Sequence, residues 1–254
     1  MAFRLAIDLD GVLADMESEL VRQAKSLFGE SVIGRLGQPA SDPPLDGSDL
    51  PSPESGSEEQ HLAAESSDDS TPPVLRVNLS ARQQRRLWKH VETIDNFWQS
   101  LTEIEPGIIA RLSAAAAERR WEIIFLTKRP QTSGATAQLQ SQRWLESKGF
   151  ALASVYVVHG SRGKIADALG IDVVIDDRPE NCLDVVADSK ARAILVWRDR
   201  EKTLPAAARR LGIGVVASMQ ECLDVLTRVD ADPSQPGVLN RLRRLLGLRE
   251  PSRL

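Results

Sequence analysis

Residues 3–15 read FRLAIDLDGVLAD: an apolar run leads directly into two aspartates, Asp8 and Asp10, and then into Gly11. Apolar side chains at both parities are typical of a strand that is buried on both faces, as in a parallel sheet. Alternate side chains of a strand point the same way, so Asp8 and Asp10 are expected to face a common site. Close carboxylates repel each other, and Mg2+ is the kind of hard cation that such oxygens bind. The same letters also occur in turns and in calcium loops, which later segments have to distinguish.

Composition sets the broad class of the protein. The chain has 254 residues, of which 42% are hydrophobic and 27% charged, as in ordinary soluble globular proteins. Its net charge of -4 is evidence against nucleic acid as a main partner. Cys182 and Cys222 fit neither a disulfide framework nor a metal knuckle, so we expect reduced thiols. The sequence shows no leader and no apolar run of the roughly 20 residues that a membrane span needs. We therefore expect a cytoplasmic protein without a membrane span.

Strand-like and helix-like segments alternate along most of the chain. Buried-type strands are predicted at 121–127, 155–158, 172–175, 193–197 and 214–217, and helices at 108–119, 134–148, 165–169, up to residue 185, and 219–229. Such β/α alternation implies right-handed crossovers between parallel strands. The fold class is therefore α/β, with a three-layer Rossmann-like core and a mainly parallel sheet.

The region between the first strand and residue 106 departs from this alternation. A helix is predicted over 15–28, a second begins at the N-cap Ser80, and a short third one covers 94–101. Residues 38–73 contain nine acidic residues, no Lys or Arg, and seven of the 14 prolines, so we expect them to be disordered. We assign 1–14 and 106–229 to a catalytic core, 15–105 to a small helical cap that contains the acidic insert, and 230–254 to a basic C-terminal tail.

Polar side chains follow several of the predicted strands or lie in loops nearby. They are Asp8, Asp10, Thr127, Lys128, Lys164, Asp176 and Asp177. Parallel strands bring their carboxyl ends to one edge of the sheet, where these groups can meet. Carboxylates with one hydroxyl and one lysine, and without a cysteine or serine triad, are typical of phosphoryl transfer.

The pattern resembles the four motifs of the haloacid-dehalogenase-like phosphohydrolases, in order and with suitable spacing. The matching segments are Asp8-Leu9-Asp10-Gly11-Val12, Thr127, Lys164 and Ile175-Asp176-Asp177. The resemblance covers residues 2–229 except the acidic insert. More narrowly, residues 10–15, 97–98 followed by 106–107, and 176–179 are similar to the 5'(3')-deoxyribonucleotidase branch, in which a helical cap follows the first strand.

The resemblance implies a role for each matching residue. Asp8 would attack phosphorus and become an aspartyl phosphate, while Asp10 would protonate the leaving oxygen and then activate water. Phosphoryl oxygens would be held by Thr127 and Lys164, with Lys128 or Arg129 nearby. Mg2+ would be bound by Asp8, the Asp10 carbonyl and Asp176, with Asp177 close by. Lys164 could instead be a surface cation at a helix start, and Asp177 a cap for the following loop.

The resulting hypothesis is a Mg2+-dependent phosphomonoester hydrolase, with a 5'-(deoxy)nucleotidase as its narrower form. Its partner would be a small-molecule phosphate ester, and no nucleic acid is expected. The alternatives are a sugar-phosphate phosphatase, a phosphatase of nucleic-acid ends, and a non-catalytic scaffold protein with the same fold. The sequence leaves open the phosphate ester, the oligomeric state, and the roles of the insert and the tail.

Overall fold

The computed structural model describes residues 3–29, 79–198, 208 and 210–230. The predictions of disorder at 38–73 and of a basic tail at 230–254 lie outside these residues, except for residue 230. The strands are β1 (Arg4–Asp8), β2 (Glu122–Thr127), β3 (Ser154–Val157), β4 (Val173–Asp176), β5 (Arg192–Val196) and β6 (Gly214–Val216). The helices are α1 (Met16–Phe28), α2 (Ala81–Thr93), the 3-10 turn η2 (Phe97–Gln99), α3 (Ile108–Arg119), α4 (Ala137–Ser147), α5 (Arg162–Leu169), α6 (Pro179–Asp188) and α8 (Met219–Asp230).

The six strands form one parallel sheet in the order β3-β2-β1-β4-β5-β6. The chain builds one half of the sheet outward from β1 to β3 and then returns to the centre at β4. The strand order therefore reverses between β1 and β4, and open α/β sheets bind their ligands outside the carboxyl ends of the strands at such a point. The α/β fold with a parallel sheet, predicted from the sequence, is confirmed.

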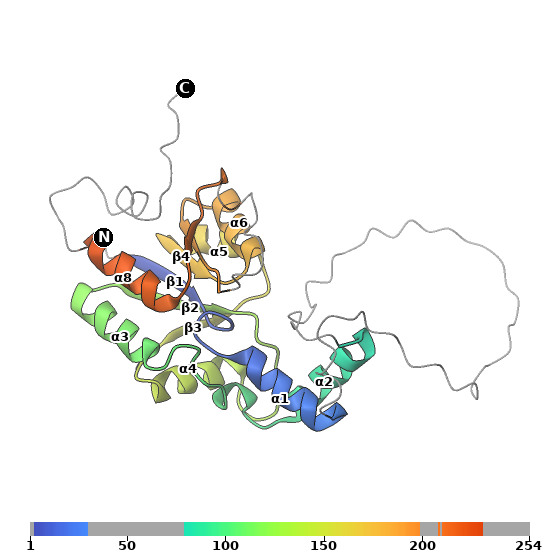
Figure 1. The fold of residues 1–254 in the computed structure, drawn as a ribbon. Coiled ribbons are helices and arrows are strands. Elements are labelled where there is room, and N and C mark those ends of the chain that lie inside the picture. Colours follow the sequence, from blue (N-terminus) through green and yellow to red (C-terminus); the bar gives the residue numbers. More distant parts are fainter. Residues whose placement is uncertain (1–2, 30–78, 199–207, 209, 231–254) are drawn as a thin grey trace, which may run out of the picture.

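Side chains alternate between the two faces of the sheet, and each face has its own apolar cluster. Leu5 and Ile7 of β1 belong to one cluster, which packs against α3, α4 and α8. Ala6, between them, belongs to the other, which packs against α5 and α6. Figure 1 shows these helices as layers on either side of the sheet. Because Asp8 follows Ile7, its side chain lies on the same face as Ala6 and emerges beside α5.

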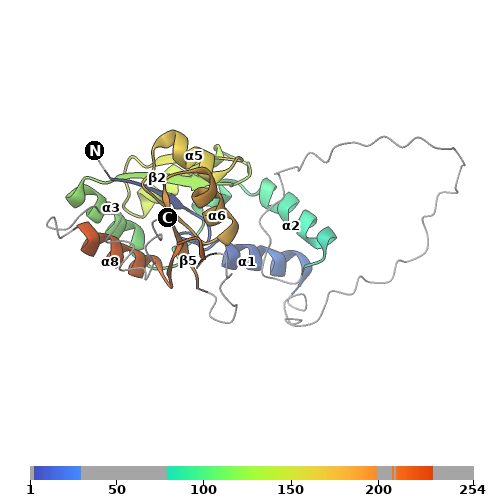
Figure 2. The same ribbon diagram turned by 90° about the horizontal axis from the view of Figure 1, so that it is seen from above.

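Helices α1 and α2 lie side by side and project beyond the carboxyl edge of the sheet (Figures 1 and 2). Ser80 caps α2 as predicted, since its side chain and that of Gln83 bond each other's backbone N–H groups. The buried side chains of both helices belong to the same apolar cluster as β1, β2 and β4. The division of the chain into a core and a cap therefore stays a prediction.

Three predicted helices differ from those in the structure. In α4 and α5 the reason is a capping side chain that starts the helix at another residue. Helix α4 begins after Thr136, whose side chain accepts a bond from Leu139 N, rather than at residue 134. Helix α5 begins at Arg162, three residues earlier than predicted, because Ser161 accepts a bond from Lys164 N. The short helix predicted over 94–101 is a single 3-10 turn, η2.

Two further predictions concern the membrane and the thiols. Over the part of the chain that the structure describes, no helix has the length and apolar character needed to cross a bilayer. Cys182 and Cys222 are both free and buried. Burial raises the pKa of each thiol well above its ordinary value, so neither is a reactive thiolate near neutral pH.

Candidate active site

Asp8 and Asp176 meet at the centre of the sheet. Ile7 of β1 pairs with Ile175 of β4, so these aspartates are the next residues on two neighbouring strands. Their side chains point toward α5 and α6, and the two residues are only 8% and 1% exposed. Asp176 is held in place by Asn181, which donates to both carboxylate oxygens, and by the backbone N–H of Arg178. This is the arrangement that the strand ends predicted.

Arg162 is the cation beside these carboxylates. Its Nη2 donates to Asp8 Oδ1 at 2.6 Å, and its Nε lies 3.8 Å from Asp176 Oδ2. The residue is 2% exposed, yet among the described residues its Nε and Nη1 have no hydrogen-bond partner. Buried guanidinium nitrogens without hydrogen-bond partners are costly, and an anion within reach of Nη1 would reduce this cost.

Lys164, predicted to hold the phosphoryl group, lies elsewhere. Lys164 is exposed and does not line the pocket. Arg162, in contrast, is buried and lines the pocket. The reason is that α5 starts at Arg162, and two residues along a helix turn a side chain by about 200°. The signal in the sequence was Ser161, an N-cap residue immediately before Arg162.

Thr127 and Asp10 also come together, as the sequence predicted, but through an unexpected third residue. Thr127 is fully buried at the end of β2, and its hydroxyl donates to Asp10 Oδ2 at 3.1 Å. Arg129 donates to both oxygens of Asp10 through Nε and Nη2. Lys128, which lies between them in the sequence, lines the pocket. The sequence singled out Lys128 or Arg129 for phosphate, and the structure directs Arg129 to Asp10.

Asp177 packs against the loop that follows β1. Gly11 has a φ of +84°, and a Cβ at this position would overlap the carboxylate of Asp177. Burial, and next the charge of Asp176, raises the pKa of Asp177 to about 7. Burial and the same neighbour raise the pKa of Asp8 well above its usual value, against the opposing effect of Arg162. The pKa of Asp176 is raised by burial as well, although Arg162 opposes this shift.

Burial is the largest cause of all three raised pKa values, and neighbouring carboxylates add to it for Asp8 and Asp177. Oxygen donors in such a group suit a hard divalent cation, which would relieve the repulsion. Among the described residues, however, no three His, Cys, Asp or Glu side chains are arranged as a ready metal site. Asp8 is turned to Arg162 and Asp176 to Asn181, so the donor chemistry fits a metal while the side chains engage protein partners.

An open pocket of about 660 Å³ lies over this cluster. Asp8, Asp10, Arg162 and Asp177 line its base. Its walls come from α1, from η2 through Trp98, and from the loops after β4 and β5, with Arg178 and Trp197. Such a volume is typical of sites for small molecules. Trp88 and Phe97 are buried in the apolar core, and Trp98 is buried as well but also lines the pocket.

Arg198, which lines the pocket, and Glu105 form a network beside the site that the sequence did not predict. Arg198 follows β5 and donates to the carbonyl oxygens of Gly11 and Val12 and to Glu105. Glu105 also accepts from the backbone N–H groups of residues 219 and 220, at the start of α8. This network connects the loop after β1 to the start of α8. A carboxylate is favourable at the N-terminus of a helix, as Glu105 is at the start of α8.

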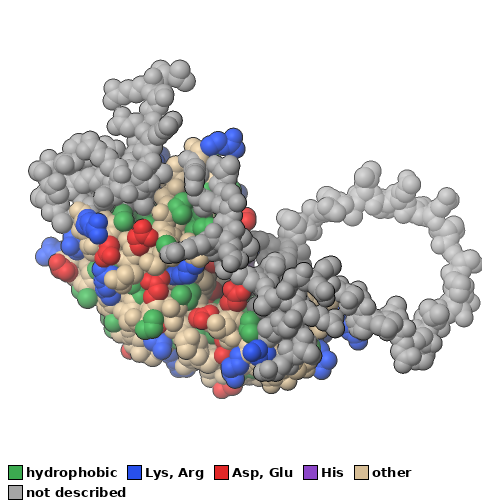
Figure 3. Space-filling model, viewed as in Figure 1, with side chains coloured by type: hydrophobic (Ala, Val, Ile, Leu, Met, Phe, Trp, Pro, Cys, Tyr) green, Lys and Arg blue, Asp and Glu red, His purple; other side chains and the backbone are tan. Residues whose placement is uncertain are grey.

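Over the face in Figure 3, acidic and basic side chains of the described residues are interspersed.

The comparisons with known proteins agree with the fold. No protein-family model and no curated protein matches this sequence. A solved structure from Thermotoga maritima, assigned as a beta-phosphoglucomutase, is similar with a TM-score of 0.50 and 17% identity over 89% of this chain and 99% of that one.

Two weaker structural similarities have TM-scores below 0.5. A haloacid-dehalogenase-like hydrolase from Streptococcus pneumoniae has a TM-score of 0.44 and 15% identity, over 88% of this chain and 97% of that chain. A hydrolase of the same superfamily, subfamily IA, from Geobacter sulfurreducens has a TM-score of 0.45 and 15% identity, over 89% and 100%. At 17% identity, the similarity to the Thermotoga maritima structure shows the fold alone, which is an α/β fold with a parallel sheet. The 5'-deoxyribonucleotidase branch receives no support from these neighbours.

Proposed function

We propose that this protein is a phosphomonoester hydrolase that works through an aspartyl phosphate on Asp8. The observation that carries the proposal is Arg162: a buried guanidinium beside Asp8, with two nitrogens that lack hydrogen-bond partners among the described residues. A phosphoryl group seated there would satisfy these nitrogens and bring phosphorus within reach of the Asp8 carboxylate. Positioned charges of this kind are the main source of catalysis in phosphoryl transfer.

The protein residues then divide the work in two steps. In the first, an Asp8 oxygen attacks phosphorus, the bond to the leaving oxygen breaks, and Asp10 gives that oxygen a proton. In the second, Asp10 takes a proton from a water whose oxygen attacks phosphorus, and the bond to Asp8 breaks. Arg162 would hold the phosphoryl oxygens, with Lys128 also lining the pocket. Thr127 would join them by turning its hydroxyl from Asp10 Oδ2 to phosphate. This assignment replaces Lys164, which is exposed, with Arg162.

Asp8, the Asp10 backbone carbonyl and Asp176 would hold a divalent cation such as Mg2+, with Asp177 close by. When bound, the cation supplies positive charge that screens the approach of a carboxylate to a phosphate dianion. Burial, and next the charge of Asp176, raises the pKa values of Asp8 and Asp177, and a cation at this place would stabilise their ionised forms.

For the substrate we propose a nucleoside or deoxynucleoside 5'-monophosphate. The partly exposed indole of Trp197 lines the pocket wall, and a nucleobase stacks well on such a ring. Arg178 and Lys128 add positive charge near the entrance. A sugar phosphate is the alternative that a substrate panel has to separate from this one.

Phosphate release from nucleoside monophosphates, sugar phosphates and 4-nitrophenyl phosphate tests the function. We expect turnover that depends on Mg2+, is abolished by chelator, and falls to background in Asp8→Asn because the nucleophile is lost. Retained turnover in Asp8→Asn would refute the nucleophile. The best ester of the panel would name the substrate class.

A pair of variants tests the cation at the phosphate site. Arg162→Met should lower kcat/KM by about 100-fold or more, which is the usual loss for one charge-stabilising group. Lys164→Met, two residues away on the exposed face, should stay within about twofold of wild type. The reverse pattern would restore Lys164 to the role that the sequence predicted.

A further inference from the structure

Arg129 is a buried arginine at the pocket, and its hydrogen bonds go to Asp10 and Ser141 rather than to Asp8 or Asp176. Its side chain is 0% exposed, although it follows β2 by only two residues. Its Nε lies 3.1 Å from Asp10 Oδ1 and 3.0 Å from Asp10 Oδ2, and its Nη2 lies 2.8 Å from Oδ1. Both carboxylate oxygens are therefore held by one planar cation.

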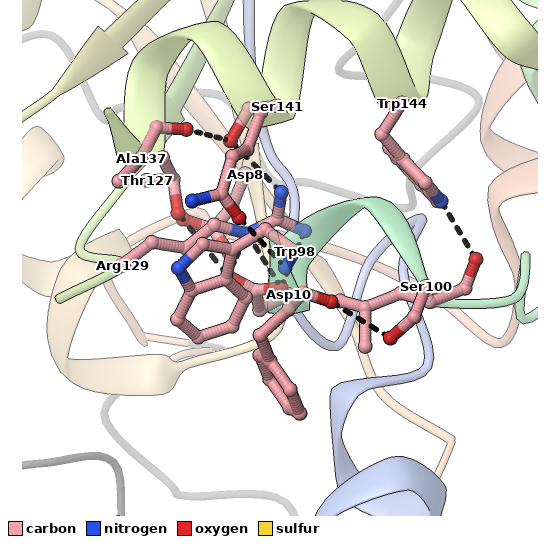
Figure 4. Close-up of polar contacts among 12 residues, drawn as sticks. Asp8, Asp10, Trp98, Ser100, Thr127, Arg129, Ala137, Ser141 and Trp144 are labelled. Atoms are coloured by element: carbon pink, nitrogen blue, oxygen red, sulfur yellow. Dashed lines mark hydrogen bonds and ion pairs between the residues drawn. The ribbon is translucent and has the colours of Figure 1, made fainter. Parts of the chain in front are cut away.

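The guanidinium is itself fixed from three sides, as Figure 4 shows. It lies 4.9 Å from the ring centre of Trp98 and 5.6 Å from that of Trp144. Its Nη1 donates at 2.9 Å to Ser141 Oγ, whose own hydroxyl donates to the carbonyl of Ala137. An arginine suits this place better than a lysine, because its flat fork stacks on rings and donates in fixed directions.

The two rings that enclose Arg129 are also tied to the backbone. Trp98 Nε1 donates to the carbonyl oxygen of Pro130, and the backbone N–H of Trp98 donates to Gln140 Oε1. Trp144 Nε1 donates to the carbonyl of Leu101. The position of Asp10 thus depends on a chain of contacts through β2, η2 and α4, rather than on its own loop alone.

We propose that Arg129 is a positioning residue that holds the Asp10 carboxylate where it exchanges protons with the leaving oxygen and with water. The inference rests on the proposed function, in which Asp10 acts as acid in the first step and as base in the second. General acid–base groups contribute only when they are within hydrogen-bond reach of the proton. Without Arg129, Asp10 loses the donor that holds both of its oxygens, and with it the fixed direction of its carboxylate.

The two steps respond differently to this loss, which makes the proposal testable. Nitrophenolate leaves without a proton, so 4-nitrophenyl phosphate can still phosphorylate Asp8. Water still needs the base, so the aspartyl phosphate then accumulates. An alkyl ester such as thymidine 5'-monophosphate or glycerol 2-phosphate needs Asp10 in the first step as well.

Stopped-flow release of nitrophenolate therefore provides the decisive measurement. Arg129→Met should give a burst of about one equivalent per protein followed by slow turnover, as should Asp10→Asn. Turnover of the alkyl esters should fall by about 100-fold without any burst. Arg129→Lys should recover part of the steady rate, and Ser141→Ala should show a smaller change in the same direction. Arg111→Met, which removes the surface ion pair with Asp224, should show no burst.

The outcomes separate this inference from the proposed function. If wild type hydrolyses neither kind of ester, both are overturned. If wild type is active and folded Arg129→Met loses both esters equally without a burst, or loses neither, Arg129 has only a structural role and the inference alone fails. If Arg129→Met does not fold, Arg129→Lys and Ser141→Ala test the inference instead. The same two readouts apply: the nitrophenolate burst, and the turnover of 4-nitrophenyl phosphate relative to that of the alkyl esters.

Discussion

Gly11 shows how a single residue controls the approach of two loops that line the pocket. Its backbone adopts φ +84°, which L side chains rarely take, and its α-carbon faces the carboxylate of Asp177 without room for a methyl group. The carbonyl of the same residue accepts from Arg198. The loop after β1 and the loop after β4 can pack this closely because position 11 has no side chain.

Gly11→Ala should lower activity by at least tenfold and the free energy of unfolding by about 1–3 kcal/mol, from the strained φ and the clash together. Kinetics and chemical denaturation would measure the two effects. Gly107→Ala is the matched control, because Gly107 also has a positive φ (+79°) but nothing within 4 Å of an added Cβ. It should lose stability and keep activity. Equal activity losses in both variants would contradict a specific role for the Gly11–Asp177 contact.

At the scale of elements, the contact between α5 and α6 places Arg162 against the sheet. A Cβ at Gly163 would overlap the backbone carbonyl of Asp184 on α6 and crowd Asp188. The absence of this side chain lets the first turn of α5 lie directly on α6. Arg162, the preceding residue, then reaches Asp8.

Gly163→Ala should push the start of α5 away from α6 and weaken the hold of Arg162 on phosphate. We expect KM for phosphate esters to rise by about tenfold, with a loss of about 1–3 kcal/mol in stability from overpacking. Steady-state kinetics with the best ester would measure the KM. Gly160→Ala, three residues earlier with open space around an added Cβ, should leave both quantities near wild type. An unchanged KM in Gly163→Ala would show that this contact does not position Arg162.

At the scale of the whole molecule, the carboxylates under the pocket oppose folding when they are ionised. The pKa of Asp177 is raised by burial from its ordinary value of 3.8 to about 7. A carboxyl group with a raised pKa favours the folded state below its unfolded pKa, and this contribution is lost as pH rises through the folded value. The cluster thus couples global stability to pH and to any cation that it binds.

We expect the contribution of Asp177 to stability to fall between about pH 4 and pH 7 in metal-free protein. The drop in thermal midpoint from pH 5 to pH 8 should therefore be smaller in Asp177→Asn than in wild type. Mg2+ should raise the midpoint of wild type more at pH 8 than at pH 5, because the cation binds ionised carboxylates. Thermal denaturation with Mg2+ or chelator measures both effects. Equal midpoints with and without Mg2+ at pH 8 would argue against a cation at this cluster.

The α/β architecture and the meeting of Asp8, Asp10, Thr127 and Asp176 followed from local pattern. Buried strands show as apolar runs, and parallel strands bring their carboxyl ends to one edge, so residues about 170 positions apart could be placed together without coordinates. The predicted bounds of α3, Ile108–Arg119, are also correct, because helical periodicity and helix-breaking residues act over only a few positions.

The partners of the charged side chains depended on packing between distant segments. Arg162 rather than Lys164 reaches Asp8, because the start of α5 and its contact with α6 set which side chain faces the sheet. Arg129 turns to Asp10 because η2 and α4 supply two indoles around it. Local sequence predicts which residues reach the edge of the sheet. Which cation pairs with which carboxylate depends on orientations set by long-range packing, since one residue of helix rotates a side chain by about 100°.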